Sequence, residues 1–297
     1  MSQQVAVIGL GLMGSRMSAN LLSAGLDLRG YDVDRARRDD FADAGGRLAN
    51  SPAEAVQGCW AAVLSLPTSD IAREVCLGNA GISEAGVDDL RVYDTTTGPP
   101  EDAVEFAAAL AEHGVSYSDS TVSGNGEVAE RGELVVMMGG SEKSYQLGLP
   151  IFEAIGRSHH HIGPVGSGAR MKLIVNHVLS IHRLALAEGL VVAELGGMDL
   201  DKTLAVLIDG LAYSKAMDLW GNRMIAGDHE IPFARLKQSH KDSRLIVQHG
   251  LDLGAPMDLV SVVLAALAEG EDEGFADYDN SAVMEVVRRR GGIGRVK

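Results

Sequence analysis

The chain contains very few cysteines and aromatic residues. Its 297 residues include two cysteines, Cys59 and Cys76, and aromatic side chains make up 4% of the total. Two cysteines cannot build a disulfide framework or complete a zinc site, and such sparse use of cysteine is typical of a reducing compartment. We therefore expect a cytoplasmic protein without a disulfide framework.

Basic residues are scarce relative to acidic ones. Lys and Arg total 26 against 41 Asp and Glu, so the formal net charge is −15 at pH 7. This sign opposes binding to a polyphosphate backbone. We therefore do not expect nucleic acid as a partner.

Long uninterrupted hydrophobic runs are absent. The most apolar stretch, residues 171–195, is interrupted by side chains such as Lys172, Arg183 and Glu188, which are too polar for the hydrocarbon core of a membrane. The first residues lack the basic segment of a signal peptide. The sequence predicts neither a membrane span nor a signal peptide.

A metal centre is not expected either. The three consecutive histidines His159–His161 would point to alternating faces of a strand. No acidic or cysteine neighbour completes a ligand set at a suitable spacing.

A regular alternation of strand-like and helix-like segments is present over residues 4–140. Such alternation predicts right-handed crossovers and a parallel sheet. The expected strands are Val5–Gly9, Leu28–Tyr31, Ala62–Leu66, Val92–Thr95 and Val115–Ser118, and the helical candidates include Leu12–Ser23, Ala53–Val56 and Asp102–His113.

The strand signal ends at about Ala169. Segments with helical apolar periodicity follow at residues 169–195, 201–226, 241–250, 256–269 and 281–289. The second half is therefore predicted to be all-helical, with its boundary in the glycine-rich stretch 163–168. We expect an α/β domain over residues 1–165 and an all-α domain over residues 166–297.

The first expected strand runs directly into a Gly-x-Gly-x-x-Gly sequence that opens a helix. Gly9 permits a tight turn, Gly11 lets the backbone approach a pyrophosphate, and Gly14 allows close packing of the helix on the strand. The sequence therefore predicts a Rossmann-type, doubly wound parallel sheet that binds a dinucleotide. The loop residues expected to hold this cofactor are Gly9, Leu10, Gly11, Leu12, Met13 and Gly14.

Asp32 ends the second expected strand, close to the spacing of about 20 residues at which a carboxylate holds the ribose 2′-hydroxyl. Because a 2′-phosphate beside this carboxylate would meet like charge, we expect NAD rather than NADP. Arg35, Arg37 and Arg38 follow closely and keep NADP as the less favoured alternative.

A polar strip formed by Lys172, Asn176 and Ser180 runs along an otherwise largely apolar helix. A helix that is apolar nearly all round is buried, and burial lowers the pKa of a lysine toward values at which it exchanges a proton with a substrate hydroxyl. Asn176, one turn on, can hold that lysine or a substrate oxygen. The pattern fits equally well a lysine that extends to solvent near a helix start.

Several separated segments resemble the β-hydroxyacid dehydrogenase family. The segment Gly9–Leu21 is similar to its cofactor signature, including the Met-Gly and Asn-Leu pairs that a generic dinucleotide turn lacks. Leu66-Pro67 and Asp94–Pro100 are similar to its next two cofactor loops, and Phe233 with Lys241-Asp242 resembles its late cofactor motif. The further cofactor residues that this resemblance implies are Leu66, Pro67, Thr97, Phe233 and Lys241.

Two other segments resemble the reaction site of that family. Residues Asp119–Gly124 are similar to its substrate-binding segment, in which Ser123 and Gly124 would offer a hydroxyl and N–H groups to a carboxylate. Gly166–Gly168, with Lys172 and Asn176, resembles its catalytic segment. The resemblance implies that Lys172 is the general acid/base and that Ser123, Gly124, Asn125 and Asn176 contact the substrate.

The substrate loop departs from the family pattern. Thr121 replaces a usual proline, and Asn125 and Val128 replace usual glycines. Val175 replaces the first of two consecutive asparagines. The amide of Asn125 either contacts a second polar group on the substrate, such as a hydroxyl, carboxylate or sulfonate, or caps its own turn.

The resemblance implies an oxidoreductase that transfers a hydride between NAD and a small 3-hydroxy acid or its semialdehyde or keto form. In 6-phosphogluconate dehydrogenases of the same superfamily a histidine and a glutamate stand where this chain has Val175 and Leu179, so that activity is not expected. An imine reductase or reductive aminase and a non-catalytic NAD-binding module stay as alternatives, although both groups generally lack the lysine. We expect a homodimer or homotetramer.

Overall fold

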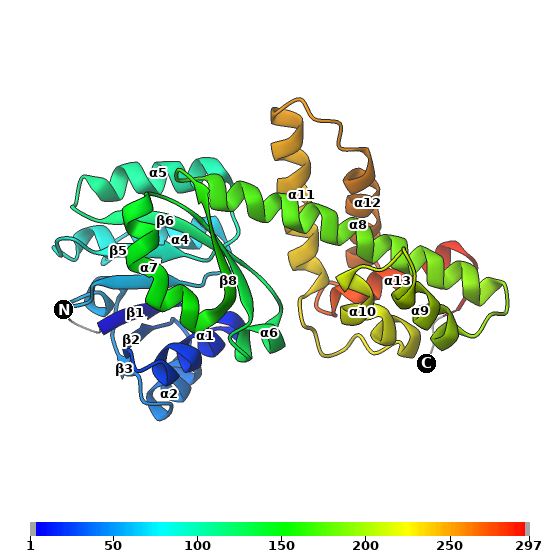
Figure 1. Cartoon of the computed structure of the whole chain (residues 1–297), viewed down its shortest axis with the longest axis horizontal. Coiled ribbons are helices and arrows are strands. Elements are labelled where there is room, and N and C mark those ends of the chain that lie inside the picture. The colour runs from blue at the N-terminus through cyan, green and yellow to red at the C-terminus, as the bar shows by residue number, and fades with distance from the viewer. Residues whose placement is uncertain (1–3, 295–297) are drawn as a thin grey trace. The chain divides into compact units, whose positions relative to one another are not determined.

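An eight-stranded sheet forms the centre of the first part of the chain, with the strand order β3-β2-β1-β4-β5-β6-β7-β8 (Figure 1). The structure is a computed structural model that describes residues 4–294. The strands are β1 (Gln4–Ile8), β2 (Asp27–Tyr31), β3 (Arg47–Leu48), β4 (Ala61–Leu64), β5 (Arg91–Asp94), β6 (Ser116–Ser123), β7 (Leu134–Gly139) and β8 (Gly156–Gly163). Because β1 pairs with both β2 and β4, the order of the strands reverses there, and ligands of such sheets bind beyond the carboxyl ends at this point.

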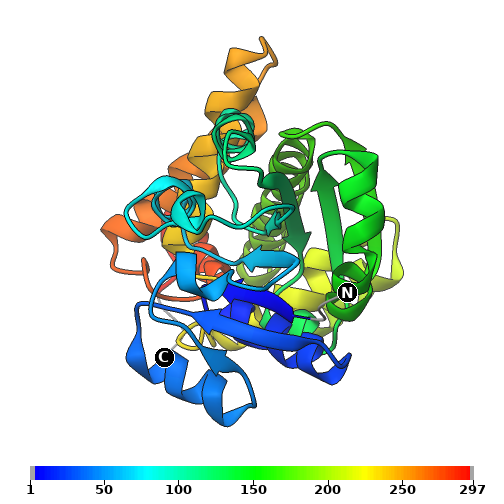
Figure 2. The ribbon, with the colours of Figure 1, turned by 90° about the vertical axis from the view of Figure 1, so that its left-hand side faces the viewer.

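Helices cover both faces of this sheet (Figures 1 and 2). They are α1 (Leu12–Ser23), α2 (Arg35–Asp43), α3 (Pro52–Ala55), α4 (Ser69–Leu77), α5 (Pro100–Ala111), α6 (Gly126–Glu130) and α7 (Glu142–Ile155), with a 3-10 turn η1 at Ile82–Glu84. Alternate residues of β1 enter two different cores. Ala6 and Ile8 pack with α3, α4 and α5, whereas Val5 and Val7 pack with α1, α2 and α7. Burial on both faces explains why β1 is a continuous hydrophobic run from Val5 to Ile8.

The pairing of β6 with β7 is antiparallel, whereas the other pairs of the described sheet are parallel. The doubly wound fold is therefore confirmed, and the expected strands pair in parallel; the antiparallel pair joins β6 to β7, a strand that the sequence analysis did not predict. Residues 124–133 between the two strands contain only the short helix α6. A parallel crossover needs about a dozen residues or more, so this connection returns the chain antiparallel.

The second part of the chain is helical, as predicted. Its helices are α8 (Ser167–Leu195), α9 (Leu200–Asp209), α10 (Lys215–Ala226), α11 (Leu236–Asp252), α12 (Asp258–Asp272) and α13 (Val283–Arg290), with a 3-10 turn η2 at Asn280–Ala282. The segment 201–226, predicted as one helical stretch, is divided into α9 and α10, because Gly210 is extended and ends α9. Leu186, Trp220 and Leu267 belong to a core of this part's own.

The chain divides into two compact units, of which one ends at Lys172 and the other begins at Leu173. The division lies within α8, so the first turns of this helix are described together with the sheet. No helix among residues 4–294 is both long and apolar enough to cross a membrane.

Candidate functional site

The loop between β1 and α1 has the backbone shape that a dinucleotide cradle requires. Gly9 has a φ of 92°, and a Cβ on it would lie 2.3 Å from the carbonyl oxygen of Ser65. A Cβ on Gly14 would lie 1.9 Å from the carbonyl oxygen of Gly9, so α1 packs directly against this loop. At Gly11 the nearest atom to an added Cβ belongs to the side chain of Arg37, at 3.5 Å, which leaves the backbone approachable.

The first turn of α1 is suited to an anion. No side-chain hydrogen bond caps this helix, whose N-cap residue is Gly11. The first N–H groups of a helix lack partners within it and attract negative charge. Leu12 and Met13 form the start of this turn, and Leu12 is half exposed. These features fit the pyrophosphate of a dinucleotide.

Asp32 follows β2 and is 6% exposed. Its Oδ2 accepts the N–H of Leu10 at 2.7 Å, and its Oδ1 accepts the N–H of Asp34 at 2.8 Å. The guanidinium of Arg37 lies 3.5 Å from Asp32 Oδ2 and also 3.5 Å from Asp34 Oδ2. The carboxylate of Asp32 therefore holds the glycine loop in place, and two acidic side chains share the charge of Arg37.

The loops after β4 and β5 lie at the same edge of the sheet as the glycine loop. The N–H of Leu66 donates to Thr96 Oγ1 at 3.3 Å, which joins the two loops. Pro67 is exposed and Thr97 is half-buried. The structure thus brings Leu66, Pro67 and Thr97 to the carboxyl edge where the dinucleotide loop begins.

The chain bends sharply after β6. Gly124 has a φ of 147°, and a Cβ there would lie 2.7 Å from a methyl group of Leu134. The next residue, Asn125, accepts the N–H of Val128 at 3.0 Å through Oδ1 and caps α6. This contact corresponds to the turn-capping alternative for Asn125.

Lys172 extends from α8 toward β6. Its Nζ donates to the carbonyl oxygen of Val122 at 2.7 Å. Val122 directly precedes Ser123 and Gly124, so the ammonium group lies beside the predicted carboxylate anchor. The side chain is half-buried.

The prediction that α8 is buried nearly all round is wrong. Ile174 is 56% exposed and Val178 is 46% exposed. Apolar residues on a helix indicate a face that can be covered, but they do not establish that the rest of the chain covers it.

Asp242 joins two of the predicted residues in the second unit. Asn176, on α8, donates through Nδ2 to Asp242 Oδ2 at 3.2 Å. The Nζ of Lys241, which like Asp242 belongs to α11, lies 3.2 Å from Asp242 Oδ1. Asn176 and Lys241 therefore belong to one polar cluster.

Phe233 is held by two residues that sequence reasoning missed. Its N–H donates to Oδ2 of the fully buried Asp279 at 2.7 Å, and its ring lies 4.2 Å from the guanidinium of Arg223. Arg223 also lies 3.4 Å from Asp279 Oδ2. No motif or spacing in the sequence connects these three residues.

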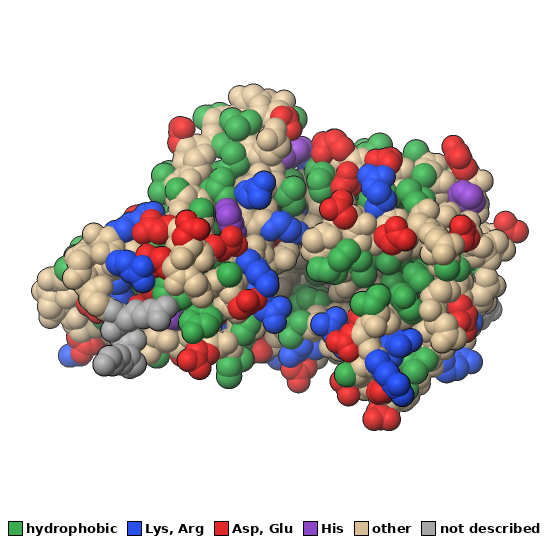
Figure 3. Space-filling view, turned by 180° about the vertical axis from the view of Figure 1, so that it is seen from behind, with side chains coloured by type: hydrophobic (Ala, Val, Ile, Leu, Met, Phe, Trp, Pro, Cys, Tyr) green, Lys and Arg blue, Asp and Glu red, His purple; other side chains and the backbone are tan. Residues whose placement is uncertain are grey.

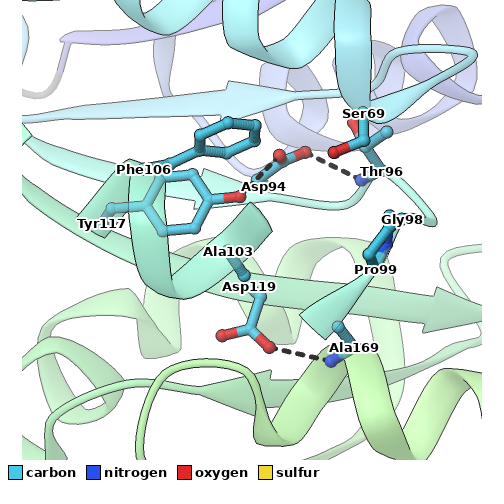
Figure 4. A pocket seen from close by; sticks show the side chains of 10 residues that line it. All are labelled: Ser69, Asp94, Thr96, Gly98, Pro99, Ala103, Phe106, Tyr117, Asp119 and Ala169. Carbon is cyan, nitrogen blue, oxygen red and sulfur yellow. Dashed lines mark hydrogen bonds between the residues drawn. The ribbon is translucent and has the colours of Figure 1, made fainter. Parts of the chain in front are cut away.

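Two buried carboxylates, Asp94 at the end of β5 and Asp119 near the middle of β6, line a small cavity (Figure 4). Asp94 accepts the N–H of Thr96 and the hydroxyl of Tyr117, each at 2.8 Å. Burial raises the pKa of Asp94, and it raises the pKa of Asp119 to about 6. Sequence reasoning placed both in family segments without assigning them a role. In the sequence, Asp94 lies near the end of an expected strand and Asp119 directly follows another.

Known proteins resemble the chain over nearly its whole length. Residues 4–163 match the family model of the NAD binding domain of 6-phosphogluconate dehydrogenase. Residues 166–287 match the model described as NAD-binding of NADP-dependent 3-hydroxyisobutyrate dehydrogenase.

Individual relatives are named as reductases or dehydrogenases of small acids and aldehydes. Glyoxylate/succinic semialdehyde reductase 1 of Arabidopsis thaliana is 29% identical over 96% of this chain and 98% of the relative. The 3-sulfolactaldehyde reductase of Escherichia coli is 30% identical over 97% of each chain. The crystal structure of 3-hydroxyisobutyrate dehydrogenase from Salmonella typhimurium has a TM-score of 0.88 at 26% identity, and it covers 95% of this chain and 99% of its own.

Proposed function

The chain belongs to the β-hydroxyacid dehydrogenase family, and from this premise we propose that Lys172 is its general acid/base. As a member of this family it transfers a hydride between NAD(P) and a small hydroxy acid or its keto or semialdehyde form. In reduction Lys172 donates a proton to the developing alkoxide, and in oxidation it accepts the hydroxyl proton. The observation that supports this proposal is the 2.7 Å contact between Nζ and the carbonyl of Val122, beside the anchor segment.

The acid group of the substrate is proposed to bind at the bend after β6. The hydroxyl of Ser123 and the N–H groups of Gly124 and Asn125 are the donors, and they suit a carboxylate because charge-assisted hydrogen bonds are strong. Asn176 is proposed to contact a substrate oxygen. A carboxylate fixed in this way leaves the reacting carbon near Lys172.

When it is bound, the nicotinamide cofactor supplies the acceptor or donor of the hydride. We propose NAD as the preferred cofactor, because the carboxylate of Asp32 would repel a 2′-phosphate and the charge of Arg37 is already shared by Asp32 and Asp34. The residues proposed to hold the cofactor are Gly9, Leu10, Gly11, Leu12, Met13, Gly14, Asp32, Leu66, Pro67, Thr97, Phe233 and Lys241.

The substrate is proposed to be a small aldehyde or keto acid, or the matching hydroxy acid, that carries a carboxylate or sulfonate. The names of two relatives, a glyoxylate/succinic semialdehyde reductase and a 3-sulfolactaldehyde reductase, support this class. We also propose a cytoplasmic homodimer or homotetramer. Val192 and Leu195 of α8 are 70% and 59% exposed, and exposed apolar side chains of this size favour an interface between copies.

The experiment that tests the function is a substrate panel followed by nicotinamide absorbance. It contains small hydroxy acids and aldehydes with one carboxylate, with an additional carboxylate or with a sulfonate, each assayed with NAD(H) and NADP(H). We expect turnover of at least one acidic substrate, with higher kcat/KM for NAD(H). Turnover of imines but of no acid would contradict the proposal, and size-exclusion chromatography with light scattering tests the oligomer.

A further inference from the structure

Asp119, near the middle of β6, binds the beginning of α8. Its Oδ1 accepts the N–H of Gly166 at 2.8 Å, and its Oδ2 accepts the N–H of Ala169 at 2.8 Å. The side chain is 3% exposed. One buried carboxylate therefore holds both the chain that enters α8 and the first turn of that helix, through two charge-assisted hydrogen bonds.

The backbones around this contact leave no room for adjustment. A Cβ on Gly168 would lie 2.2 Å from the carbonyl oxygen of Asp119, and a Cβ on Gly139 of β7 would lie 2.6 Å from Asp119 Oδ1. The hydroxyl of Thr121 donates to the carbonyl of Gly168 at 2.9 Å. This second bond from β6 to α8 needs a hydroxyl, which the proline usual in the family at this position does not have.

The two chain segments that meet here carry the two ends of the proposed reaction site. Lys172 lies one helical turn after Ala169, and Ser123 lies four residues after Asp119 on β6. We propose that Asp119 is a positioning residue, assisted by Thr121, that fixes the distance between the Nζ of Lys172 and the acid anchor at Ser123. The inference rests on the proposed function of Lys172.

The ionisation of Asp119 gives this contact a recognisable pH dependence. Burial raises the pKa of Asp119 to about 6, although the two N–H donors oppose that shift. The ionisable groups that interact with it are Asp94 from β5 and Tyr117 from β6, and Cys76 from α4 interacts with those two. Residues 167–169 of α8 contribute no ionisable side chain. As the pH falls through about 6, the carboxyl gains a proton and loses one of its two acceptor positions.

This protonation weakens the contact without weakening the fold. Because the pKa of Asp119 is higher in the folded state than in the unfolded chain, the folded state binds the proton more tightly between pH 4 and 6. The contribution of this group to the free energy of unfolding therefore increases as the pH falls through that range. If protonation of Asp119 causes a loss of turnover near pH 6, that protonation does not destabilise the folded state.

The test is the pH profile of kcat in the direction of reduction, with the best substrate of the panel and with NADH. In this direction Lys172 acts protonated, so its own titration removes activity only at high pH. We expect kcat of the unmodified enzyme to fall below pH 6. Asp119→Asn keeps the shape of the side chain but lacks the charge. We expect this variant to lower kcat about 10-fold or more and to leave the KM for NADH unchanged. We also expect it to abolish the fall of kcat below pH 6, which is the acidic limb of the profile.

Asp94→Asn is the matched control, because it removes the neighbouring charge and leaves the bonds of Asp119 to α8. We expect it to keep the acidic limb and to move it to lower pH, since Asp94 contributes to the raised pKa of Asp119. A profile of the unmodified enzyme that stays flat to pH 5, or an Asp119→Asn variant that keeps the limb, overturns the inference.

A second variant keeps the proposal testable if Asp119→Asn does not fold. Thr121→Val retains the shape of the side chain and removes the bond to Gly168. We expect kcat to fall 2- to 5-fold, with the KM for NADH unchanged, and an unchanged kcat would contradict the contribution of Thr121. Lys172→Ala is measured in parallel. Full turnover of this variant would contradict the proposed function of Lys172. If this variant is inactive but the pH profile of the unmodified enzyme is flat, only the positioning role of Asp119 is contradicted.

Discussion

At the scale of single residues, buried carboxylates in or directly after the strands organise the segments that a ligand would contact. Asp32 accepts the N–H of Leu10, Asp94 accepts the N–H of Thr96, and Asp119 accepts two N–H groups at the start of α8. A backbone N–H buried without an acceptor destabilises the folded state, so these side chains replace the water that the loops exclude. The same residues therefore serve both the fold and the site.

Asp32→Asn removes a negative charge and keeps one acceptor for the glycine loop. Since the charge is what repels a 2′-phosphate, we expect the ratio of kcat/KM for NADP to that for NAD to rise about 10-fold or more. Initial rates with both cofactors measure this ratio. An unmodified enzyme with the higher kcat/KM for NADP would show that Asp32 does not select the cofactor.

Asn125→Asp separates the cap of α6 from the electrostatics of the anchor. Aspartate is as good an N-cap residue as asparagine, so we expect the melting temperature to stay the same. Its charge lies beside the proposed carboxylate site, so we expect the KM for an acidic substrate to rise about 10-fold or more. An unchanged KM in a folded variant would place the acid group of the substrate elsewhere.

At the scale of elements, the contact of α1 with the loop after β1 depends on two glycines with different tasks. Gly14 is needed because a Cβ at this position would lie 1.9 Å from the carbonyl oxygen of Gly9, whereas Gly11 has a φ of −70° that alanine adopts without strain. Gly14 supports packing, and Gly11 leaves space at the helix terminus.

Gly14→Ala and Gly11→Ala form a matched pair. The added Cβ at position 14 meets a carbonyl oxygen, so we expect a loss of about 2 kcal/mol or more in the free energy of unfolding of the cofactor-free protein. At position 11 we expect unchanged unfolding and NADH binding weakened about 10-fold or more. Chemical denaturation and the fluorescence of NADH measure the two effects. Equal destabilisation by both changes would mean that Gly11 serves packing alone.

The elements also show which parts of the fold a sequence predicts. β1 and β4 were predictable because burial on both faces gives them continuous apolar runs, and the glycine spacing locates the cofactor loop. The edge strand β8 contains Arg157 and three histidines, so no apolar pattern marks it. The direction of β7 depends on the length of a connection, and the contact of Phe233 with Asp279 joins segments far apart in the chain.

At the scale of the whole molecule, the net negative charge opposes the approach of anions, large or small. The net charge is −15, and basic side chains lie among acidic ones on the face shown in Figure 3. An acid substrate therefore needs local donors rather than a general positive field. The segment from Val122 to Asn125 is our proposed source of such donors, and Lys172 contacts it through the carbonyl of Val122.

The most direct measurement of the central claim is the chemical rescue of Lys172→Ala by small primary amines. Loss of a positioned general acid/base lowers turnover by about 10² or more, and we expect the affinity for NADH to stay within about 2-fold. If Lys172 transfers the proton, added amines restore turnover in proportion to their concentration, with rates that depend on the pKa of the amine. Two results would contradict the assignment of Lys172. In one, the variant keeps most of its turnover. In the other, the variant binds NADH normally but is inactive, and no amine restores its turnover.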